Sequence, residues 1–439
     1  MHIVEAFCDF QREPLIRPFG FKGSYMHESW QNAVLLKSDS GAEGLGLGTQ
    51  SVLWSDAEIF SATSESGGNA LMYAVLDRAV QMVRRQTFED PMAMLEAIRP
   101  EIMRYAAGIT GRADVRETFA LNALVALDNA AWLLYASECG IDSFDDLIPQ
   151  ESRPALSHRH RRLASIPLMS YAIPVPEIRA AVDSGYFFMK IKIGSPGDPR
   201  TMLETDLQRV RAIHRAIGGI DTPHTRDGRI PYYFDANGRY PDKETLARLL
   251  DGLADLGITE RIAILEEPFP ESYEADVGDL GVRIAADESA HTDRDAVRRI
   301  DMGYGAIALK PIAKTMSMTL RIAAAAHELN VPCFCADLTV NPVLVEWNNN
   351  MAARLAPIPG LDTGLLETNG HQNYSRWQRM VAAHPCPGAA WRETKNGLFE
   401  LDDDFYRRSG GIFLPLPYYR GWFTALSPAG SASGGPEKR

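Results

Sequence analysis

The sequence has few cysteines, no long apolar run and no excess of positive charge. Only five of its 439 residues are cysteines, and no two of them form the Cys-x-x-Cys pair of a structural zinc site. No stretch approaches the ~18 uninterrupted apolar residues of a membrane span, and the first residues lack the basic and apolar regions of a signal peptide. We therefore expect a reduced, cytoplasmic protein that does not bind a membrane.

Acidic side chains outnumber basic ones. The 45 Lys and Arg residues against 57 Asp and Glu residues give a formal net charge of −12. Nucleic-acid binding requires clustered Lys and Arg, so this balance excludes nucleic acid as the main partner. The basic stretch at residues 158–162 has no interleaved aromatic residues, and we interpret it as a solvated linker. Because 45% of the residues are hydrophobic, the chain can bury a large core and is not intrinsically disordered.

The first part of the chain, residues 1–135, has the pattern of an α+β domain. Residues 33–37 and the glycine-rich residues 43–48 are predicted to form a hairpin around the turn between them. Helical periodicity follows at residues 70–83 and 121–136. We interpret residues 136–165, which include a basic and proline-containing stretch, as the link to the next domain.

From residue 166 to residue 384 the pattern changes to short apolar strands that alternate with helices. Asp198-Pro199 gives one of these helices an N-cap and a proline in its first position. The strands are predicted at residues 166–172, 187–193, 231–235, 262–266, 283–287, 306–310, 332–336 and 364–367. Eight such units predict a (β/α)₈-type TIM barrel. A doubly wound open sheet is the alternative, but no Gly-x-Gly-x-x-Gly follows any of the strands.

Two segments remain after the predicted barrel. Residues 385–426 carry two aromatic clusters and are expected to pack back on the first domain, so that the C-terminal segment completes the capping domain. Residues 427–439 are rich in Gly, Ser and Pro, and we expect a disordered tail.

Polar residues stand at the carboxyl ends of five consecutive predicted strands, where barrel enzymes build their sites. A single residue of this kind would be explained as a helix cap or a solvated side chain, but five strand ends in order are not. The motifs are Lys190-Ile191-Lys192, Asp235-Ala236-Asn237, Glu266-Glu267-Pro268, Asp287-Glu288-Ser289 and Leu309-Lys310-Pro311. Three carboxylates from three successive strands form an oxygen-rich site suited to Mg²⁺, with lysines on both sides.

In order and spacing these motifs resemble the enolase superfamily, and within it the mandelate racemase/muconate lactonizing enzyme family. The glycine-rich hairpin before Gly48 and the helix at residues 126–132 resemble that family's capping domain. The resemblance implies that Mg²⁺ is bound by three carboxylates, and that two lysines act as acid and base on opposite faces of the substrate. The implied ligands are Asp235, Glu266 and Asp287, and the implied acid/base pair is Lys192 and Lys310.

Elementary chemistry supports these roles. The α-proton of a carboxylate is a very weak acid, so the enediolate formed by its removal must be stabilised, as Mg²⁺ can do. Lys190 disfavours a second ammonium beside it, and we interpret it as a residue that tunes Lys192 and binds a carboxylate. Asn237 is expected to orient a ligand or a lysine, with a plain turn residue as the alternative. Glu267 and Glu288 are expected to point away from the mouth of the barrel.

A lysine on the sixth strand, in place of a His-Asp dyad on the sixth and seventh, favours the muconate-lactonizing and dipeptide-epimerase type. The resemblance implies an isomerase that racemises or epimerises a small-molecule carboxylate by Mg²⁺-dependent removal of its α-proton. The alternatives are β-elimination or cycloisomerisation, as in o-succinylbenzoate synthase or muconate cycloisomerase, and a non-catalytic ligand-binding barrel. We also expect a homo-oligomer.

The substrate is expected to contact the eighth strand and a loop of the first domain. Glu367 and Asn369 replace the Asp-x-Asp that dipeptide epimerases usually carry, so one carboxylate remains for an amino group. Residues 19–25 would be a mobile loop, with Phe19, Phe21 and Tyr25 as an apolar lid. These features favour an amino-acid derivative such as a dipeptide. Further polar candidates near the mouth are Asp337 and His371, whereas Cys333 and Cys335 are expected to be packing residues.

Overall fold

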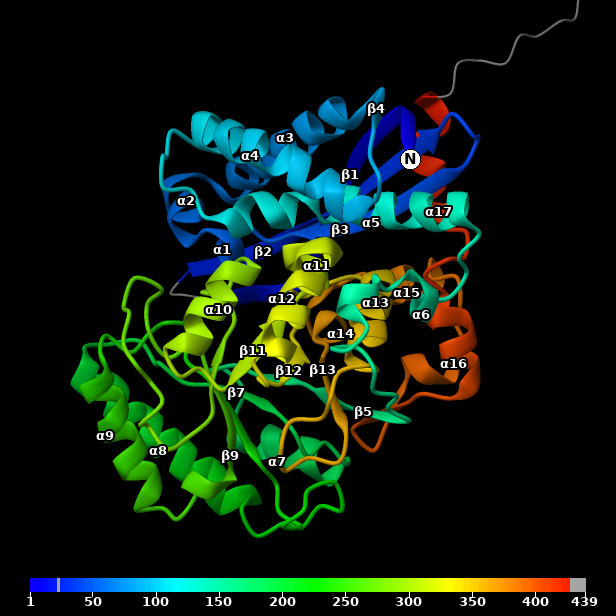
Figure 1. The fold of residues 1–439 in the computed structure, drawn as a ribbon. Coiled ribbons are helices and arrows are strands. Elements are labelled where there is room, and N and C mark those ends of the chain that lie inside the picture. The colour runs from blue at the N-terminus through cyan, green and yellow to red at the C-terminus, as the bar shows by residue number, and fades with distance from the viewer. Residues whose placement is uncertain (22–23, 427–439) are drawn as a thin grey trace, which may run out of the picture.

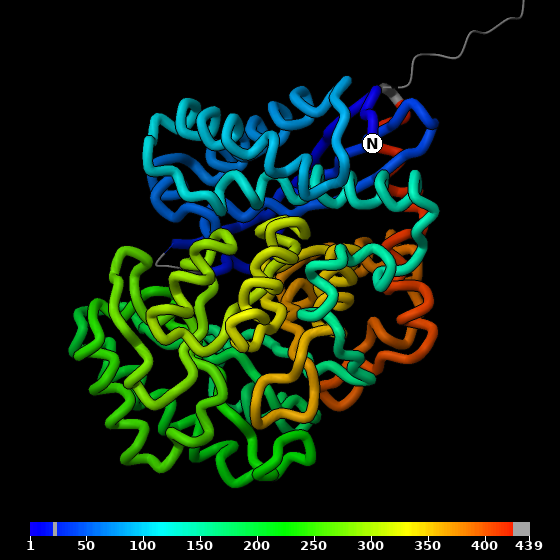
Figure 2. Tube along the Cα trace, in the orientation of Figure 1, coloured from blue at the N-terminus to red at the C-terminus, as the bar shows by residue number. Residues whose placement is uncertain are grey.

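The computed structural model describes residues 1–21 and 24–426. The tip of the predicted mobile loop, residues 22–23, and the predicted tail, residues 427–439, lie outside the described part. The chain forms two layers, a sheet with covering helices above a barrel (Figure 1). The tube in Figure 2 shows that the last described residues return to the upper layer, near the N-terminus.

The upper layer contains a four-stranded antiparallel sheet in the order β3-β2-β1-β4. Its strands are β1 (His2–Phe21), β2 (Ser24–Ser38), β3 (Glu43–Gln50) and β4 (Gln86–Thr87). The predicted hairpin is confirmed as the pairing of β2 with β3. The long strand β1 was not predicted, and its pairing with β2 places residues 19–21 and 24–25 of the expected loop in strands.

Helices cover this sheet and lead the chain out of it. They are α1 (Val52–Ser55), α2 (Ala57–Ala62), α3 (Glu65–Val83), α4 (Pro91–Thr110), α5 (Glu117–Cys139) and α6 (Phe144–Leu147). The two predicted helices correspond to α3 and α5. Helix α5 is long and apolar enough to cross a membrane, but 89% of its most apolar window is buried inside the protein. Helix α5 is therefore a core helix of this protein.

The glycines of β3 let α5 approach the sheet closely. A Cβ atom at Gly44 or Gly46 would lie only 2.1 Å from backbone atoms of Ala130, and one at Gly48 would lie 2.9 Å from the backbone of Ala126. Side chains at these positions would push the helix away from the sheet. The glycine-rich strand and the alanine-rich helix thus form one packed unit.

The lower layer is a curled parallel sheet of eight strand positions. The parallel pairings run β5-β13-β12-β11-β10-β9-β8-β7-β6, and β5 and β6 are two parts of one strand position separated by Pro167. The strands are β5 (Arg162–Ile166), β6 (Leu168–Met169), β7 (Lys190–Lys192), β8 (Tyr232–Asp235), β9 (Ile262–Glu266), β10 (Ile284–Ala286), β11 (Ala306–Leu309), β12 (Cys333–Cys335) and β13 (Gly364–Glu367). This arrangement confirms the predicted barrel.

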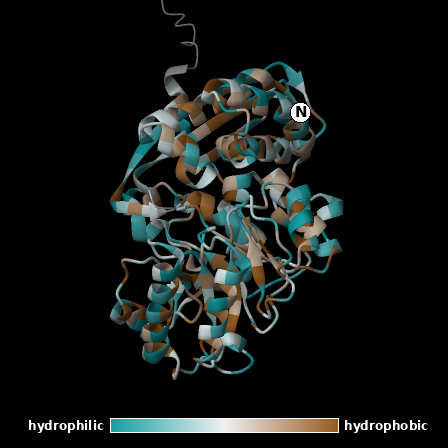
Figure 3. Ribbon diagram, turned by 90° about the vertical axis from the view of Figure 1, so that its left-hand side faces the viewer, coloured by the Kyte–Doolittle hydropathy of each residue, from teal (hydrophilic) through white to brown (hydrophobic). Residues whose placement is uncertain are grey.

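Helices connect the strands on the outside of the barrel. They are α7 (Val175–Asp183), α8 (Pro199–Ile217), α9 (Lys243–Ala254), α10 (Asp293–Asp301), α11 (Pro311–Lys314), α12 (Met316–Glu328), α13 (Pro342–Ala352), α14 (Gly370–Asn373) and α15 (Trp377–Ala382). Asp198 caps α8 as predicted, since its side chain accepts a hydrogen bond from Thr201 N. Figure 3 shows apolar residues gathered inside the molecule and more hydrophilic residues on the outer helices.

The structure differs from the prediction at two places in the barrel. The first strand begins at Arg162 rather than at residue 166, because β5 pairs with β13 while only β6 pairs with β7. The connection between β9 and β10, residues 267–283, lies within the described residues and contains no helix. Pro268 and Pro270 near the start of this connection are incompatible with a helix interior.

The C-terminal segment contacts both layers. Its elements are β14 (Thr394–Lys395), β15 (Leu398–Glu400), α16 (Asp403–Arg408) and α17 (Pro417–Arg420). Strand β15 pairs antiparallel with β5 of the barrel. Only the last part reaches the upper layer, where Arg420 binds Glu43 and the Tyr418 hydroxyl donates to Gln11.

A buried contact fixes the upper layer on the barrel. Ser317, at the start of α12, donates from its hydroxyl and its backbone N to the Asp128 carboxylate on α5, at 2.5 and 3.0 Å. Trp132 Nε1 donates to the same hydroxyl at 3.0 Å. The two layers are therefore held in one orientation over the mouth of the barrel.

Candidate active site

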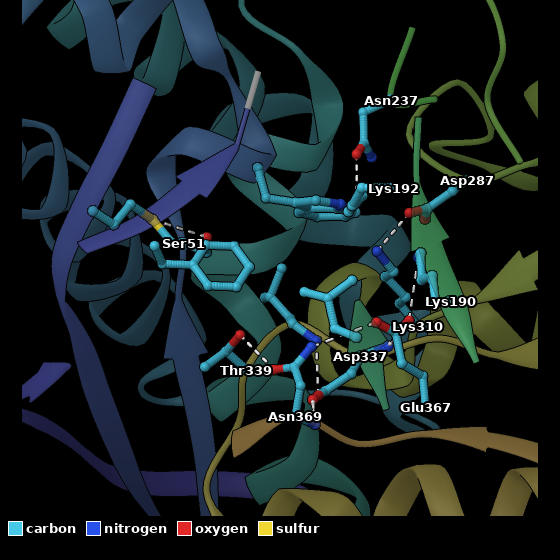
Figure 4. A pocket seen from close by; sticks show the side chains of 15 residues that line it. Ser51, Lys190, Lys192, Asn237, Asp287, Lys310, Asp337, Thr339, Glu367 and Asn369 are labelled. Carbon is cyan, nitrogen blue, oxygen red and sulfur yellow. Dashed lines mark hydrogen bonds and ion pairs between the residues drawn. The ribbon is translucent and has the colours of Figure 1, made fainter. Parts of the chain in front are cut away.

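A cavity lies between the carboxyl ends of the barrel strands and the sheet above them (Figure 4). Its volume, counted for the centres of water molecules, is about 40 Å³, so the side chains around it leave little free space. Its floor consists of charged strand-end residues, and its roof comes from the upper layer. The lining residues are Phe19, Met26, Ser51, Trp54, Leu168, Lys190, Lys192, Asn237, Asp287, Lys310, Asp337, Leu338, Thr339, Glu367 and Asn369.

Lys190 lies among three carboxylates. Its Nζ is 2.8 Å from Glu266 Oε1, 3.0 Å from Asp235 Oδ2 and 3.3 Å from Glu367 Oε2. Burial by itself lowers the pKa of Lys190, but the three carboxylates raise it well above its ordinary value. This environment favours a fixed positive charge over a proton carrier at Lys190.

Lys192 points into the cavity from the same strand. Its Nζ donates to Asp235 Oδ2 at 2.6 Å and also to Asn237 Oδ1. Asn237 has a positive φ of 46° and bonds through its Nδ2 to Glu288 Oε1 at 3.1 Å. Asn237 therefore links a lysine on β7 to a carboxylate that follows β10, which is more than a turn residue does.

On the far side of the floor, Lys310 contacts Asp287. Lys310 Nζ donates to Asp287 Oδ2 at 2.5 Å, and Lys314 Nζ donates to the Asp287 backbone oxygen at 2.7 Å. Burial would raise the pKa of Asp287, but these two ammonium groups lower it. Burial lowers the pKa of Lys310, but the neighbouring Asp287 raises it by more. The pKa of Lys310 therefore lies above its ordinary value. Lys314, four residues beyond Lys310 on the one-turn helix α11, was missed by sequence reasoning.

Carboxylate oxygens converge at the centre of the floor. One oxygen each from Glu266, Asp287 and Glu288 lie within 4.8 Å of one another, close enough to share a cation. Asp287 Oδ1 accepts no hydrogen bond from any described residue. Burial and the neighbouring Asp235 raise the pKa of Glu266, as expected where buried carboxylates are crowded. This donor set fits a hard cation such as Mg²⁺, which prefers a few carboxylates with remaining positions for water or substrate oxygens.

The expected metal ligands are only partly brought together. Glu266 and Asp287 belong to the oxygen cluster, whereas Asp235 Oδ2 lies against Lys190 and Lys192. Glu288, which we expected to point away, lines a groove outside the cavity together with Glu267, although one of its oxygens lies near those of Glu266 and Asp287. Glu267 does point away, because its Oε2 accepts from the backbone of Asp287 and from Ser289.

A buried aspartate on α8 positions the end of the strand that carries the two lysines. Asp206 accepts from Gly194 N at 2.7 Å and from the Ser195 hydroxyl at 2.6 Å. The Tyr240 hydroxyl donates to the same carboxylate at 2.7 Å. These bonds fix the turn that begins two residues after Lys192. In the sequence, this role of Asp206 is indicated only by its position on the otherwise apolar face of α8.

The roof is more apolar than the floor. Trp54, on the short helix α1, places its ring centroid 4.6 Å from Lys310 Nζ, a cation–π distance. Phe19 and Met26 also line the cavity, whereas Tyr25 is 62% exposed and lines a neighbouring groove. The side chain of Phe21 lies outside the described residues. Sequence reasoning found Phe19 but missed Trp54, Met26 and Ser51, which follow no strand-end motif.

The remaining wall comes from the ends of β12 and β13. Glu367 Oε2 accepts from Asp337 N at 3.0 Å, and Asp337 Oδ2 accepts from Asn369 N at 2.7 Å. Burial, followed by the nearby Glu367 charge, raises the pKa of Asp337 to about 7. The expected substrate residues Glu367 and Asn369 thus line the cavity together with Asp337. His371 lines a different cavity, and Cys333 is buried in the barrel.

Residues 175–385 match the family described as enolase C-terminal domain-like. The barrel domain belongs to the enolase superfamily. This agrees with the order of strand-end motifs in the sequence and with the domain placed over the mouth of the barrel. No curated protein sequence matches the chain.

Solved structures of other enolase-superfamily proteins resemble the chain over most of its length. A dipeptide epimerase from Enterococcus faecalis V583, complexed with Mg and the dipeptide L-Leu-L-Tyr, is 17% identical with a TM-score of 0.61, over 92% of this chain and 98% of that one. An N-succinyl Arg/Lys racemase from Bacillus cereus ATCC 14579 is 15% identical with a TM-score of 0.62, over 92% and 93%. An L-talarate dehydratase from Polaromonas sp. JS666, complexed with Mg and L-glucarate, is 17% identical with a TM-score of 0.59, over 86% and 88%. At these identities the likeness shows the shared fold.

Proposed function

We propose that this protein removes the α-proton of a carboxylate substrate and returns a proton to the opposite face, as a racemase or epimerase does. The observation that carries the proposal is the position of two lysines. Lys192 is on β7 and Lys310 is at the end of β11, four strand positions apart in a barrel of eight. They therefore approach the cavity from opposite sides, and inversion at a carbon atom requires an acid and a base on opposite sides.

The carboxylates between the two lysines would hold a divalent cation. Glu266 and Asp287 are the proposed common ligands, and Asp235 or Glu288 is the third. Bound there, Mg²⁺ would stabilise the negative charge that develops on the substrate carboxylate as its α-proton leaves. Lys190, fixed among carboxylates at 2.8–3.3 Å, would attract the same end of the substrate.

The two lysines would divide the proton transfers between them. Lys310, as a neutral amine, would remove the α-proton of one enantiomer and become an ammonium, while the Lys192 ammonium gives its proton to the other face and becomes neutral; the roles would reverse for the opposite enantiomer. Asn237 would orient Lys192 through its Oδ1, and the Trp54 ring would cover Lys310. The buried surroundings exclude bulk water from both lysine side chains, so the proton is not lost to solvent during the transfer.

The substrate is proposed to be an amino-acid derivative such as a dipeptide. With its carboxylate on the floor, its distal part would face the wall formed by Glu367, Asn369 and Asp337. Two carboxylates on that wall, each held by backbone N–H groups, suit an ammonium or amide group. The dipeptide bound in the Enterococcus structure has the same two ends, a carboxylate and an amino group.

The test is exchange of the substrate α-hydrogen with D₂O. Purified protein with Mg²⁺ would be incubated with dipeptides, N-acyl amino acids, acid sugars and muconates, and deuterium uptake followed by NMR. We expect uptake with inversion for at least one dipeptide, and none after chelation. Loss of water or ring closure without inversion would assign the chain to elimination or cycloisomerisation, and absence of any exchange would leave only a ligand-binding barrel.

A single substitution tests the substrate class. Glu367→Gln should raise KM strongly for a substrate with a free α-ammonium and hardly change KM for its N-acylated analogue, because only the first loses an ion pair. Asp337→Asn should act in the same direction. Equal effects on both substrates would contradict a cationic distal group.

A further inference from the structure

A second cavity lies on the outside of the barrel, between α13, α15 and the C-terminal segment, near the labels α13 and α15 in Figure 1. We call it the rear cavity. Its volume, counted for the centres of water molecules, is about 390 Å³, and it shares no lining residue with the cavity between the two layers. Its lining includes Val345, Glu346, Thr368, Arg392 and the aromatic residues Tyr186, Trp377, Trp391 and Phe399.

Buried charged groups meet at one end of the rear cavity. The side chains of Glu346, Arg392 and His384 are 2%, 8% and 1% exposed. His384 Nε2 lies 3.5 Å and Arg392 Nε lies 3.7 Å from Glu346 Oε1, and neither is a hydrogen bond. Among the described residues, Glu346 Oε1 accepts no hydrogen bond, whereas its Oε2 accepts from Asn349 at 3.2 Å. The atom of this cluster that is both buried and without a hydrogen-bond partner in the described part of the chain is His384 Nε2, whereas Glu346 belongs to the residues that line the cavity.

Arg392 provides the complementary group. Its Nη1 donates to the Cys386 backbone oxygen at 3.2 Å, and its Nη2 has no partner in residues 1–21 and 24–426. An acceptor oxygen and a donor nitrogen, neither with a hydrogen-bond partner among the described residues, therefore belong to two neighbouring side chains that line the same cavity. A ligand that carries an ammonium and a carboxylate on neighbouring atoms would satisfy both.

The other walls are aromatic. Trp391 and Phe399 are buried, and Tyr186 and Trp377 are partly exposed. Aromatic side chains favour contact with a large apolar or aromatic group of a ligand. The cavity therefore has a charged end and apolar walls. These suit a small molecule that carries charged groups at one end and an apolar group at the other.

We propose that the rear cavity binds a free amino acid with a large apolar or aromatic side chain. Its ammonium would bind Glu346 Oε1, its carboxylate would bind Arg392 Nη2, and its side chain would lie among the aromatic residues. The site does not depend on the reaction in the other cavity. It adjoins that cavity, however, because Thr368 lines the rear cavity while its neighbours Glu367 and Asn369 line the candidate active site.

Three probes test separately what each charge of the ligand contributes to binding. L-Phenylalanine has both, phenylacetate lacks the ammonium, and 2-phenylethylamine lacks the carboxylate. Binding of each to the full chain, treated with EDTA, would be measured by saturation-transfer NMR and calorimetry. We expect saturable binding of one L-phenylalanine per chain, and at least tenfold weaker binding of the other two probes. No saturable binding of L-phenylalanine, L-tryptophan or L-leucine would overturn the proposal, as would equal binding of all three probes.

Matched variants locate the site. Glu346→Gln and Arg392→Leu should each weaken L-phenylalanine binding at least tenfold, whereas the exposed Arg376→Leu and the active-site variant Lys310→Met should not. Because Glu346 and Arg392 are buried, Val345→Trp provides a second test: it fills the cavity from α13 without removing a charge. Loss of binding in Val345→Trp with an unchanged Tm would support the proposal. Unchanged binding in all three rear-cavity variants, or loss only in Lys310→Met, would overturn it.

Discussion

The floor and the roof of the candidate active site are built from different kinds of contact. On the floor, lysines and carboxylates at the ends of β7 to β11 form ion pairs of 2.5–3.0 Å. On the roof, Phe19 and Met26, which face each other on β1 and β2, and Trp54 on α1 line the cavity with mainly apolar side chains. The difference suggests that the floor carries the proton chemistry and that the roof excludes water and positions groups below it.

The largest effect is expected from Glu266→Gln on the floor. The change keeps the shape of the side chain but removes one negative charge from the oxygen cluster, so turnover should fall by roughly 10²–10³-fold or more. Deuterium exchange and Mn²⁺ binding would be measured together, since both should fall. Glu260→Gln, an exposed residue next to the start of β9, is the matched control and should change neither. Full activity in Glu266→Gln, or in chelated wild type, would contradict the metal assignment.

The next test separates the two sides of the floor. Lys192→Ala and Lys310→Ala should each abolish epimerisation, because one face then lacks its acid or base. Each variant should still exchange the α-hydrogen of the one enantiomer that faces the remaining lysine. Chiral chromatography combined with deuterium NMR would detect both results. Full racemisation by both variants would show that the two lysines are not the acid/base pair.

The floor could be predicted from the sequence because its chemistry is local. The motifs with Lys190, Lys192, Asp287 and Lys310 each follow a strand, and a parallel barrel brings all such ends to one face. The exact ligand set could not be predicted. Whether Glu288 or its neighbour turns inward depends on the backbone at the strand end, which alternation along a strand does not determine.

The roof could not be predicted to the same degree. Trp54 lies on a one-turn helix after β3, and it reaches Lys310 only because α5 packs on the glycines of β3 and fixes the layer above the barrel. That position depends on contacts between residues more than a hundred positions apart, such as Asp128 with Ser317. The extension of β1 to Phe21 was missed for a related reason, since Pro14 and Gly20 interrupt its pattern.

A smaller effect is expected from the roof. Trp54→Leu removes the ring that covers Lys310, and a cation–π contact of about 1–2 kcal/mol corresponds to a roughly tenfold loss of rate. The loss should be confined to exchange on the Lys310 side, with the Lys192 side nearly unchanged. Trp54→Phe, which keeps a ring, should lose less. Equal losses on both sides would mean that Trp54 acts only by shaping the cavity as a whole.

The contact that holds the roof to the floor should affect activity least, and its change is expected in the stability of the protein. Burial raises the pKa of Asp128 to about 6, although its hydrogen bonds from Ser317 act in the opposite direction. A carboxyl group whose pKa is raised by folding contributes to the stability of the folded protein. The contribution is fully present below the pKa of the unfolded chain, about 3.9, and is lost as the pH rises through the folded pKa of about 6. Asp128→Asn, which cannot ionise, should therefore gain stability relative to wild type between pH 4 and pH 7, by up to roughly 3 kcal/mol. Urea unfolding at several pH values would measure the difference, with the exposed Asp142→Asn as the control that shows no such trend. A difference between Asp128→Asn and wild type that does not vary with pH would mean that Asp128 keeps an ordinary pKa, and that the contact between the layers tolerates a buried negative charge without cost.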